Sequence, residues 1–452
     1  MKSTLHTAKT ALFAIMLCFG AMVTLAAYSF ASPLIADERA DVNYWLARTS
    51  DGDAVLMDAD ELKTANQRMR ELNADTLIDF NEYPTKFTGT DIKAKIDQLT
   101  AYVSKDLSLP KMYKGGLPLT QSYFDHVIDN RNTASLTEIE RPILYALTTK
   151  RVNLRLLPER AGWFDTADDI HFDNLQQTAL DPAEPVAVLS ESKDGKYVFV
   201  VAYNSPGWVE KSALAFTDRT TWLGYVNPTD FAVVINHKVT VPAGDDDILM
   251  QMGSRLPLVN REKTSGNQYL VKIPRRDHSG ALVEKNALVS ADDFSVGYLP
   301  VTENNFVRQA FKFLGDNYGW GGLEDSVDCS AFTADVYRSM GLILPRNSGE
   351  QRKGTPSTID VSNMSNEDKF ATLQKFRAGT LFHKKGHVAM YLGSDDSGTP
   401  IFIHSLSSYW DDEGGWSKKY VLTVGVTNFW YTNYQGAPMV SDFIAITPYT
   451  IK

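Results

Sequence analysis

Cysteine is nearly absent from this 452-residue chain, which contains only Cys18 and Cys329. The chain also lacks an excess of positive charge, because 45 Lys and Arg face 55 Asp and Glu, a formal net charge of −10. This balance argues against nucleic acid or an anionic membrane surface as the main partner. Hydrophobic residues make up 43% of the chain, which excludes disordered and low-complexity classes. The length favours roughly three domains.

Residues 1–31 have the layout of a secretory signal peptide, in which Lys2 and Lys9 accompany an apolar run over 11–27 and small residues occupy the cleavage positions. An uncleaved membrane anchor is the alternative, because the run nearly spans a bilayer. Cys18 lies in this run without a lipoprotein cleavage box, so we expect no lipid anchor. No later stretch is long and apolar enough to span a membrane. We therefore expect an exported protein, in the periplasm or cell envelope, that keeps only Cys329 and forms no intramolecular disulfide.

The spacing at which hydrophobic residues recur divides the rest of the chain into regions. Residues 32–150 are predicted to be a helical N-terminal region, because apolar residues recur at three- and four-residue spacing. From 151 the period changes to two, with turn-bounded strands typical of a small β-barrel. A similar pattern follows, and its end, Val-Glu-Lys-Asn-Ala-Leu (283–288), resembles Val-Glu-Lys-Ser-Ala-Leu (209–214). We interpret 151–216 and 217–297 as an imperfect tandem repeat of roughly 75 residues.

Short motifs give the two barrels a family resemblance. Asn153-Leu154-Arg155 near the start and Gly207-Trp208-Val209 near the end of the first barrel resemble a bacterial SH3 (SH3b) domain, as do the matching strands of the second copy. The resemblance implies barrels that position an enzyme on the cell wall or line part of its cleft. Two generic β-barrels without a ligand are the alternative.

Cys329 is either a buried core residue or a nucleophile. A helix is predicted over 303–315, a glycine-rich turn over 318–322 and a second helix over 330–340. Cys329 therefore lies at a helix N-terminus, where backbone N–H groups and the helix dipole are expected to lower the thiol pKa. This position favours a nucleophile.

A thiolate nucleophile needs a base and a group that orients the base. Two histidines lie on consecutive predicted strands, His387 at the start of 386–393 and His404 in 401–405. We expect His387 to take the Cys329 proton and His404 to fix its tautomer and orientation. A single strand histidine would more simply be a half-buried structural residue. His383, on a Lys-Lys-Gly loop, is interpreted as a surface residue.

These pieces together resemble the NlpC/P60 family of cell-wall cysteine peptidases over roughly residues 298–452. The matching segments are 318–322, 328–332, 344–348, 379–382, 386–388 and 403–405. The resemblance implies a papain-like α+β domain with Cys329 as nucleophile, His387 as base and His404 as third polar residue. The expected fold class is thus multidomain α+β: a helical N-terminal region, two small SH3-like β-barrels and a C-terminal papain-like NlpC/P60 domain.

The whole layout is similar to γ-D-glutamyl-L-diamino acid endopeptidases, which cut murein (peptidoglycan) stem peptides. That resemblance implies that Asp328 binds the free amine of an N-terminal L-alanine, although a plain helix N-cap is the alternative. It also places Tyr318, Ser330 and Ser348 at substrate-contact positions. Two positions depart from the family pattern, Asn347 and Thr380, each where an aspartate is usual. The first removes one carboxylate contact, and the loop over 320–329 is also shorter than in some relatives.

Three hypotheses about the function are compatible with these observations. The first is a cysteine endopeptidase of peptidoglycan stem peptides. The second is a non-catalytic wall-binding scaffold, which the intact Cys329, His387 and His404 disfavour. The third is an NlpC/P60-fold amidase or acyltransferase, against which only Asp328 and Ser348 speak. We expect a monomer that needs no cofactor or metal.

Overall fold

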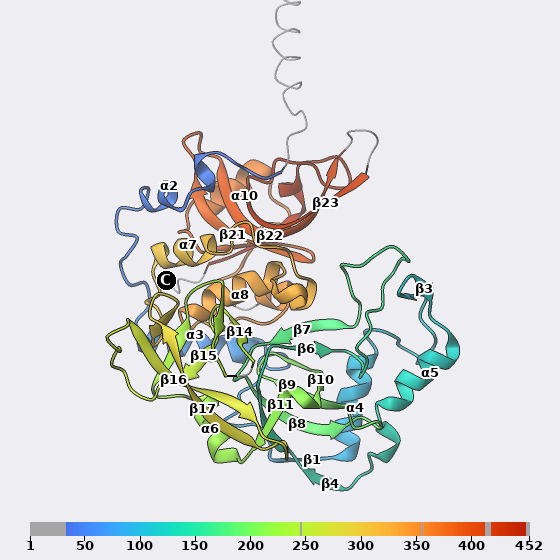
Figure 1. The fold of residues 1–452 in the computed structure, drawn as a ribbon. Helices are drawn as coiled ribbons and strands as arrows, with labels where there is room; N and C mark the ends of the chain where they lie inside the picture. The colour runs from blue at the N-terminus through green and yellow to red at the C-terminus, as the bar shows by residue number, and fades with distance from the viewer. Residues whose placement is uncertain (1–32, 245, 354, 356, 412–416, 449–452) are drawn as a thin grey trace, which may run out of the picture.

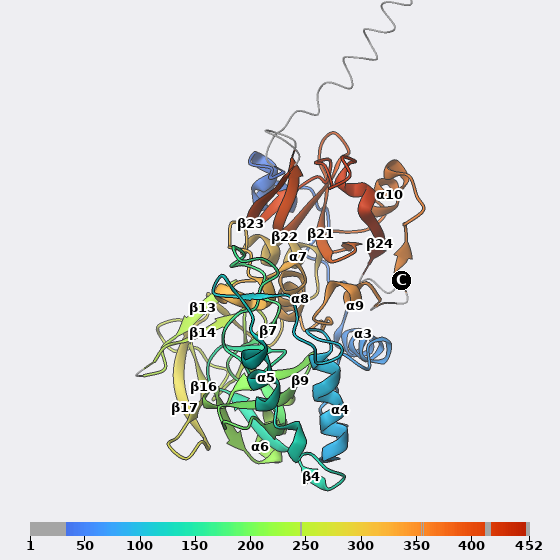
Figure 2. The same cartoon turned by 90° about the vertical axis from the view of Figure 1, so that its right-hand side faces the viewer.

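The computed structural model describes residues 33–448, apart from 245, 354, 356 and 412–416. The predicted signal peptide and Cys18 lie outside the described residues. Within 33–448, with those gaps, no helix has the length and hydrophobicity needed to cross a membrane. Figure 1 shows a C-terminal α+β unit above two β-rich units, and the N-terminal segment runs from beside the upper unit down to the lower ones, as the rotated view in Figure 2 also shows.

The N-terminal segment mixes helices with short strands. Its helices are α2 (Val42–Leu46), α3 (Ala59–Leu72), α4 (Gly89–Thr100) and α5 (Gln121–Asn130), and its strands are β1 (Lys86–Thr88), β2 (Tyr113–Lys114), β3 (Leu117–Pro118), β4 (Glu140–Pro142) and β5 (Leu144–Thr148). Capping boxes start two of the helices, Asp58 with Glu61 at α3 and Thr88 with Asp91 at α4. The predicted helical region is therefore only partly helical, because the segments between the periodic stretches form strands.

The first β unit is one seven-stranded sheet. It adds to β5 the strands β6 (Val152–Arg155), β7 (Gln176–Leu180), β8 (Pro185–Glu191), β9 (Tyr197–Ala202), β10 (Ser205–Glu210) and β11 (Leu214–Thr217), in the order β11-β5-β8-β9-β10-β6-β7. All neighbouring pairs are antiparallel. Because β5 pairs with both β8 and β11, this sheet begins before residue 151.

The second β unit is divided among smaller sheets. It contains α6 (Arg219–Val226), β12 (Phe231–Val234), β13 (Lys238–Val241), β14 (Ile248–Gln251), β15 (Arg255–Pro257), β16 (Gln268–Arg276), β17 (Leu282–Ser290) and β18 (Phe294–Val296). These strands form the sheets β15-β12-β18, β13-β14 and β16-β17. A second copy of the first sheet is thus not confirmed.

The repeated motif folds differently in its two places. Residues 209–214 leave β10, pass through a 3₁₀ turn at Lys211–Ala213 and enter β11. Residues 283–288 instead lie inside β17, which pairs with β16 along its whole length. Pairing with β16 therefore gives residues 283–288 a different structure from 209–214, although the two sequences are similar.

The C-terminal unit packs helices on a six-stranded sheet. The helices are α7 (Glu303–Phe311), α8 (Cys329–Ser339), α9 (Ser348–Lys353) and α10 (Asn366–Leu373), and the strands are β19 (Ile359–Asp360), β20 (Leu381–Lys384), β21 (His387–Ser394), β22 (Pro400–Asp411), β23 (Ser417–Thr427) and β24 (Phe443–Thr447). The sheet order is β19-β24-β20-β21-β22-β23, and α8 packs on β21 and β22. The four elements on which the sequence argument rested, α7, α8, β21 and β22, are all present.

Two apolar cores tie the units together. One joins α4 with strands of both β units, through residues such as Ile96, Phe199 and Ile273. The other joins α2 and α3 to α7, α8 and the large sheet, through residues such as Trp45 and Phe332. The N-terminal segment thus buries side chains against every unit, which fixes the β units relative to α8.

Candidate active site

Cys329 is the first residue of α8, and Asp328 is the N-cap that accepts the backbone N–H of Ala331 at 2.9 Å. The helix start is held against the sheet because Ser405 on β22 donates to the carbonyl of Val327 at 2.8 Å. Cys329 is 7% exposed, so the thiol lies just below the surface. The predicted position of the thiol at a helix N-terminus is what the structure shows.

His387 and His404 form a hydrogen-bonded pair on adjacent strands. His387 Nε2 lies 2.8 Å from His404 Nδ1, and His404 Nε2 lies 3.0 Å from Thr427 Oγ1 on β23. The Phe429 ring packs beside His404, with centroids 5.0 Å apart. These hydrogen bonds occupy Nε2 of His387, so Nδ1 is the ring nitrogen that does not contact His404. Among the described residues, His387 and the Cys329 thiol form no direct hydrogen bond.

The protonation states differ from those expected for a preformed thiolate. Burial and the Asp328 carboxylate raise the pKa of Cys329 to about 12, against the opposing backbone N–H of Val388. The expectation of a lowered thiol pKa is therefore wrong for this structure, because burial outweighs the helix N-terminus. Burial, His404 and Lys384 lower the pKa of His387 well below its ordinary value. Near neutral pH, the Cys329 thiol and the His387 imidazole of the resting site are thus both neutral.

Asp328 does more than cap α8, because its carboxylate binds Arg346 through both oxygens. Arg346 Nη2 lies 2.6 Å from Oδ2 and Nη1 lies 3.2 Å from Oδ1, and Gly321 and Ser330 also donate to the carboxylate. Burial acts to raise the pKa of Asp328, but Arg346 and the backbone N–H groups of Ala331 and Gly321 hold it below its ordinary value. Asp328 is therefore an ionised carboxylate whose charge is already balanced.

The first β unit contacts this site directly. Arg346 Nε donates to Thr178 Oγ1 at 2.7 Å, and Gln176 Nε2 donates to the carbonyl of Gly321 at 2.8 Å. Gly321 has φ +59°, and a Cβ there would lie 2.6 Å from Gln176, so this close approach requires glycine. The barrel therefore positions the loop that precedes the cysteine.

Aromatic side chains from both units meet beside that loop. The Phe172 ring lies 6.2 Å from Tyr318 and 5.6 Å from Trp320, centroid to centroid. Tyr420 on β23 lies 6.1 Å from Phe172. The first β unit thus contacts Tyr318 and Trp320 through Phe172.

The structure brings two of the three expected contact residues to the cysteine. Tyr318 is close enough to Cys329 and Asp328 that both charges, after burial, raise its pKa. Ser330 donates to Asp328 at 3.2 Å and accepts from Arg346 at 3.0 Å. Ser348 begins α9, and its backbone lies beside the His383 ring. Within the described part of the chain, no hydrogen bond joins the Ser348 side chain to Asp328, Cys329 or Ser330.

His383 is not a surface residue, which corrects the interpretation from sequence. It lies on β20 opposite Val388 and is 0% exposed. Burial and the nearby Arg352 lower its pKa to about 3, against the Ser348 backbone, which acts to raise it. Neither ring nitrogen meets a partner with hydrogen-bond geometry in the described residues. The two lysines that follow it suggested a loop, but the strand pairing places His383 inside the unit.

Sequence reasoning missed several polar residues of the site. Arg346 lies within the quoted segment 344–348, and a buried carboxylate at Asp328 implies a nearby cation. Thr427, Gln176 and Thr178 come from other strands, and no local pattern in the sequence marks them. Within the described residues, no group of His, Cys, Asp or Glu has the arrangement of a metal site.

Comparison with known families gives this site a class. Residues 315–424 match the NlpC/P60 family, and residues 163–210 match the SH3 domain of the SH3b1 type. The chain therefore carries an NlpC/P60 domain and an SH3b domain. The first match contains Cys329, His387 and His404, and the second covers much of the first β unit.

Individual relatives cover larger parts of the chain. The chain is 27% identical over 265 residues to a γ-D-glutamyl-L-lysine dipeptidyl-peptidase of Bacillus cereus, covering 52% of this chain and 70% of that protein. It is 24% identical over 232 residues to the Bacillus subtilis protein of the same name, covering 49% and 71%. Among solved structures, an NlpC/P60 endopeptidase from Photobacterium damselae subsp. piscicida shares the fold, with a TM-score of 0.74, 18% identity and coverage of 93% and 98%.

Proposed function

We propose that this protein is a cysteine peptidase that cuts the bond between γ-D-glutamate and the diamino acid of peptidoglycan stem peptides. The observation that carries the proposal is a buried cysteine at the start of α8 that packs on β21 and β22. Its thiol meets the backbone N–H of Val388, the residue after His387, and His404 holds the His387 ring. The names of the two Bacillus relatives support the choice of bond.

The proposed chemistry uses one tautomer of the histidine pair. If His387 donates from Nε2 to His404 Nδ1, His404 donates from Nε2 to Thr427, and the lone pair of His387 Nδ1 is left free. That nitrogen takes the Cys329 proton as Sγ attacks the γ-glutamyl carbonyl. His387 then gives the proton to the departing amine of the diamino acid, which leaves a thioester on Cys329. Water hydrolyses the thioester, with His387 again accepting and returning the proton.

Neutral resting groups suit this sequence of steps. A thiol with a raised pKa is not a free thiolate, so the proton must move during the attack rather than before it. A histidine with a lowered pKa is unprotonated at neutral pH and can accept that proton. Substrate contact is expected to shorten the distance between thiol and imidazole, as catalytic hydrogen bonds tighten in the bound complex.

We also propose a preference for a free N-terminal L-alanine, with Asp328 near its ammonium and Tyr318 and Ser330 beside the peptide. Arg346 already balances the Asp328 charge, so an added ammonium shares the carboxylate rather than neutralising it. We therefore expect a modest preference, about tenfold or less in kcat/KM, which corresponds to one hydrogen bond of about 0.5–1.5 kcal/mol.

Product analysis by mass spectrometry tests both parts. L-Ala-γ-D-Glu-diaminopimelate and its lysine counterpart are incubated with wild type and Cys329→Ala. Release of L-Ala-D-Glu by wild type alone supports the peptidase, whereas intact peptide in both samples contradicts it. N-acetylated peptides test the preference separately, and equal cleavage of free and acetylated forms would remove Asp328 from amine recognition.

A further inference from the structure

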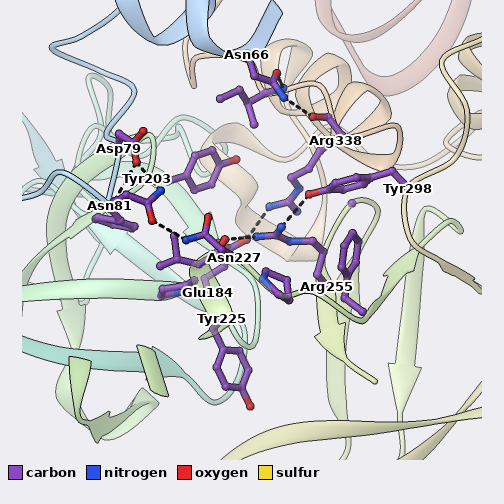
Figure 3. A pocket seen from close by; sticks show the side chains of 18 of the residues that line it. Asn66, Asp79, Asn81, Glu184, Tyr203, Tyr225, Asn227, Arg255, Tyr298 and Arg338 are labelled. Atoms are coloured by element: carbon purple, nitrogen blue, oxygen red, sulfur yellow. Dashed lines mark hydrogen bonds and ion pairs between the residues drawn. The ribbon is translucent and has the colours of Figure 1, made fainter. Parts of the chain in front are cut away.

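A cavity lies away from the cysteine, between α3, the two β units and the C-terminal end of α8. Its volume is about 470 Å³, and Cys329, His387 and His404 do not line it. Figure 3 shows side chains from these four parts of the chain facing the same space. The volume lies within the range of about 300–1,000 Å³ typical of small-molecule sites.

One of its cations is already paired. Arg338, near the end of α8, lies 2.8 Å from Asp181 and 2.7 Å from Glu184. Its guanidinium faces the cavity beside that of Arg255, as Figure 3 shows. Asp335 lies 3.6 Å from the same guanidinium, so Arg338 is fully paired and holds Glu184 in the wall.

Three other cations of the wall form no direct ion pair in the described residues, although Arg255 lies near enough to Glu184 to act against the burial that raises the pKa of that carboxyl. Lys63 and Arg70 come from α3, and Arg255 from β15, and none forms an ion pair within the described residues. Arg255 donates to the Tyr298 hydroxyl at 2.9 Å and lies 5.6 Å from the centre of the Phe231 ring. The wall carboxylate outside the Arg338 cluster is Asp79, which accepts from Asn81 at 2.9 Å. The cavity thus has an excess of positive charge.

The remaining lining combines amides with rings. Asn66 binds the backbone of Gly341 and Ile343, which leaves it fixed in orientation. Asn227 and Asn81 form a pair at 2.6 Å at the opposite rim. Each amide can form further hydrogen bonds, and Tyr203, Phe231 and Tyr298 line the cavity beside them, so the wall can meet peptide bonds as well as charge.

We propose that this cavity binds a short acidic peptide, of two or three residues with more than one carboxylate. Lys63, Arg70 and Arg255 would meet the carboxylates through charge-assisted hydrogen bonds. The cavity is too large for a single inorganic anion, which could contact only part of this wall. The choice of L-Ala-D-Glu as probe rests on the proposed function, because that dipeptide is the expected product, but the binding measurement does not require cleavage.

Calorimetric titration of the full chain carrying Cys329→Ala tests the proposal. The probes are L-Ala-D-Glu and, for comparison, inorganic phosphate. Arg70→Gln is added as the test variant, because the Arg70 side chain makes no hydrogen bond or ion pair in the described structure. Arg68→Gln on the exposed side of the same helix is the matched control.

We expect the dipeptide to bind and Arg70→Gln to weaken it about fivefold to tenfold, while Arg68→Gln leaves the Kd unchanged. The proposal is overturned if the dipeptide gives no binding at millimolar concentration, if phosphate binds as tightly, or if Arg70→Gln and Arg68→Gln behave alike. Because the active cysteine is absent from all samples, these results are independent of whether wild type cleaves stem peptides.

Discussion

His383 and His387 lie at the two sides of the β20–β21 turn and are four residues apart, yet their surroundings differ. Both are buried, and burial lowers the pKa of both. His387 is hydrogen-bonded to His404, whereas neither nitrogen of His383 has a partner in the described residues. Burial alone therefore does not distinguish a candidate base from a core residue. The distinguishing feature is the hydrogen-bonded chain that holds one ring nitrogen and leaves the other free.

Replacing each histidine by alanine should separate the two roles. Positioned proton transfer is worth about 10²–10⁴ in rate, so His387→Ala should lower kcat/KM by that factor while the protein stays folded. His383→Ala should instead lower stability through the cavity that it leaves, with kcat/KM per folded molecule nearly unchanged. Cleavage assays combined with thermal unfolding measure both quantities. Equal loss of activity in the two variants would contradict the assignment of His387.

Alkylation of Cys329 by iodoacetamide should report the neutral thiol. With a pKa of about 12, the thiolate fraction and hence the rate should rise about tenfold per pH unit between pH 7 and 9. The rate is measured by intact-protein mass spectrometry, with the denatured chain as the reference for an ordinary thiol. A rate that levels off below pH 8.5 would instead support the lowered pKa that the helix N-terminus alone predicts.

The unpartnered His383 should make folding sensitive to acid. Its folded pKa of about 3 lies below that of an exposed histidine, so the unfolded chain binds a proton that the folded chain does not. Stability from this residue is full above about pH 6.5 and is lost as the pH falls toward 3, at up to about 1.4 kcal/mol per unit. His383→Leu should therefore flatten the decline. Urea unfolding between pH 7 and 4.5 measures it, and parallel curves for both proteins would refute the effect.

The smallest of these effects concerns the outer end of the hydrogen-bonded chain. Thr427→Val removes the partner of His404 Nε2 without changing the side-chain size much, and we expect kcat/KM to fall about twofold to tenfold. Thr427→Ser keeps the hydroxyl and should retain wild-type activity. If Val and Ser variants are equally active, Thr427 does not fix the histidine tautomer.

Local sequence patterns predicted the elements that present the site. Helical periodicity and a capping residue place Cys329 at the start of α8, and the continuous apolar runs of 388–392 and 401–403 define β21 and β22. These signals depend on residues that are close in the sequence, so they can be recognised without knowing which strands are neighbours. The same is true of the first barrel, where Leu154 and Trp208 are fully buried.

What the sequence could not predict depends on pairing between distant segments. The burial of His383 follows from its place between β24 and β21, and the two lysines after it give the opposite impression. The Asp328–Arg346 ion pair and the contact of Arg346 with Thr178 join three separate segments. The thiol pKa depends on total burial rather than on the helix start alone. Each of these features depends on contacts that exist only after the units have packed together.

The central claim is that Cys329 carries the γ-glutamyl group during the reaction. Acid quenching during turnover of L-Ala-γ-D-Glu-diaminopimelate, followed by mass spectrometry, should show a dipeptidyl adduct on the peptide that contains Cys329. The adduct should be absent in Cys329→Ala and should disappear when wild type is left to finish the reaction. Cleavage by Cys329→Ala at the wild-type rate, or an adduct on another residue, would contradict the account.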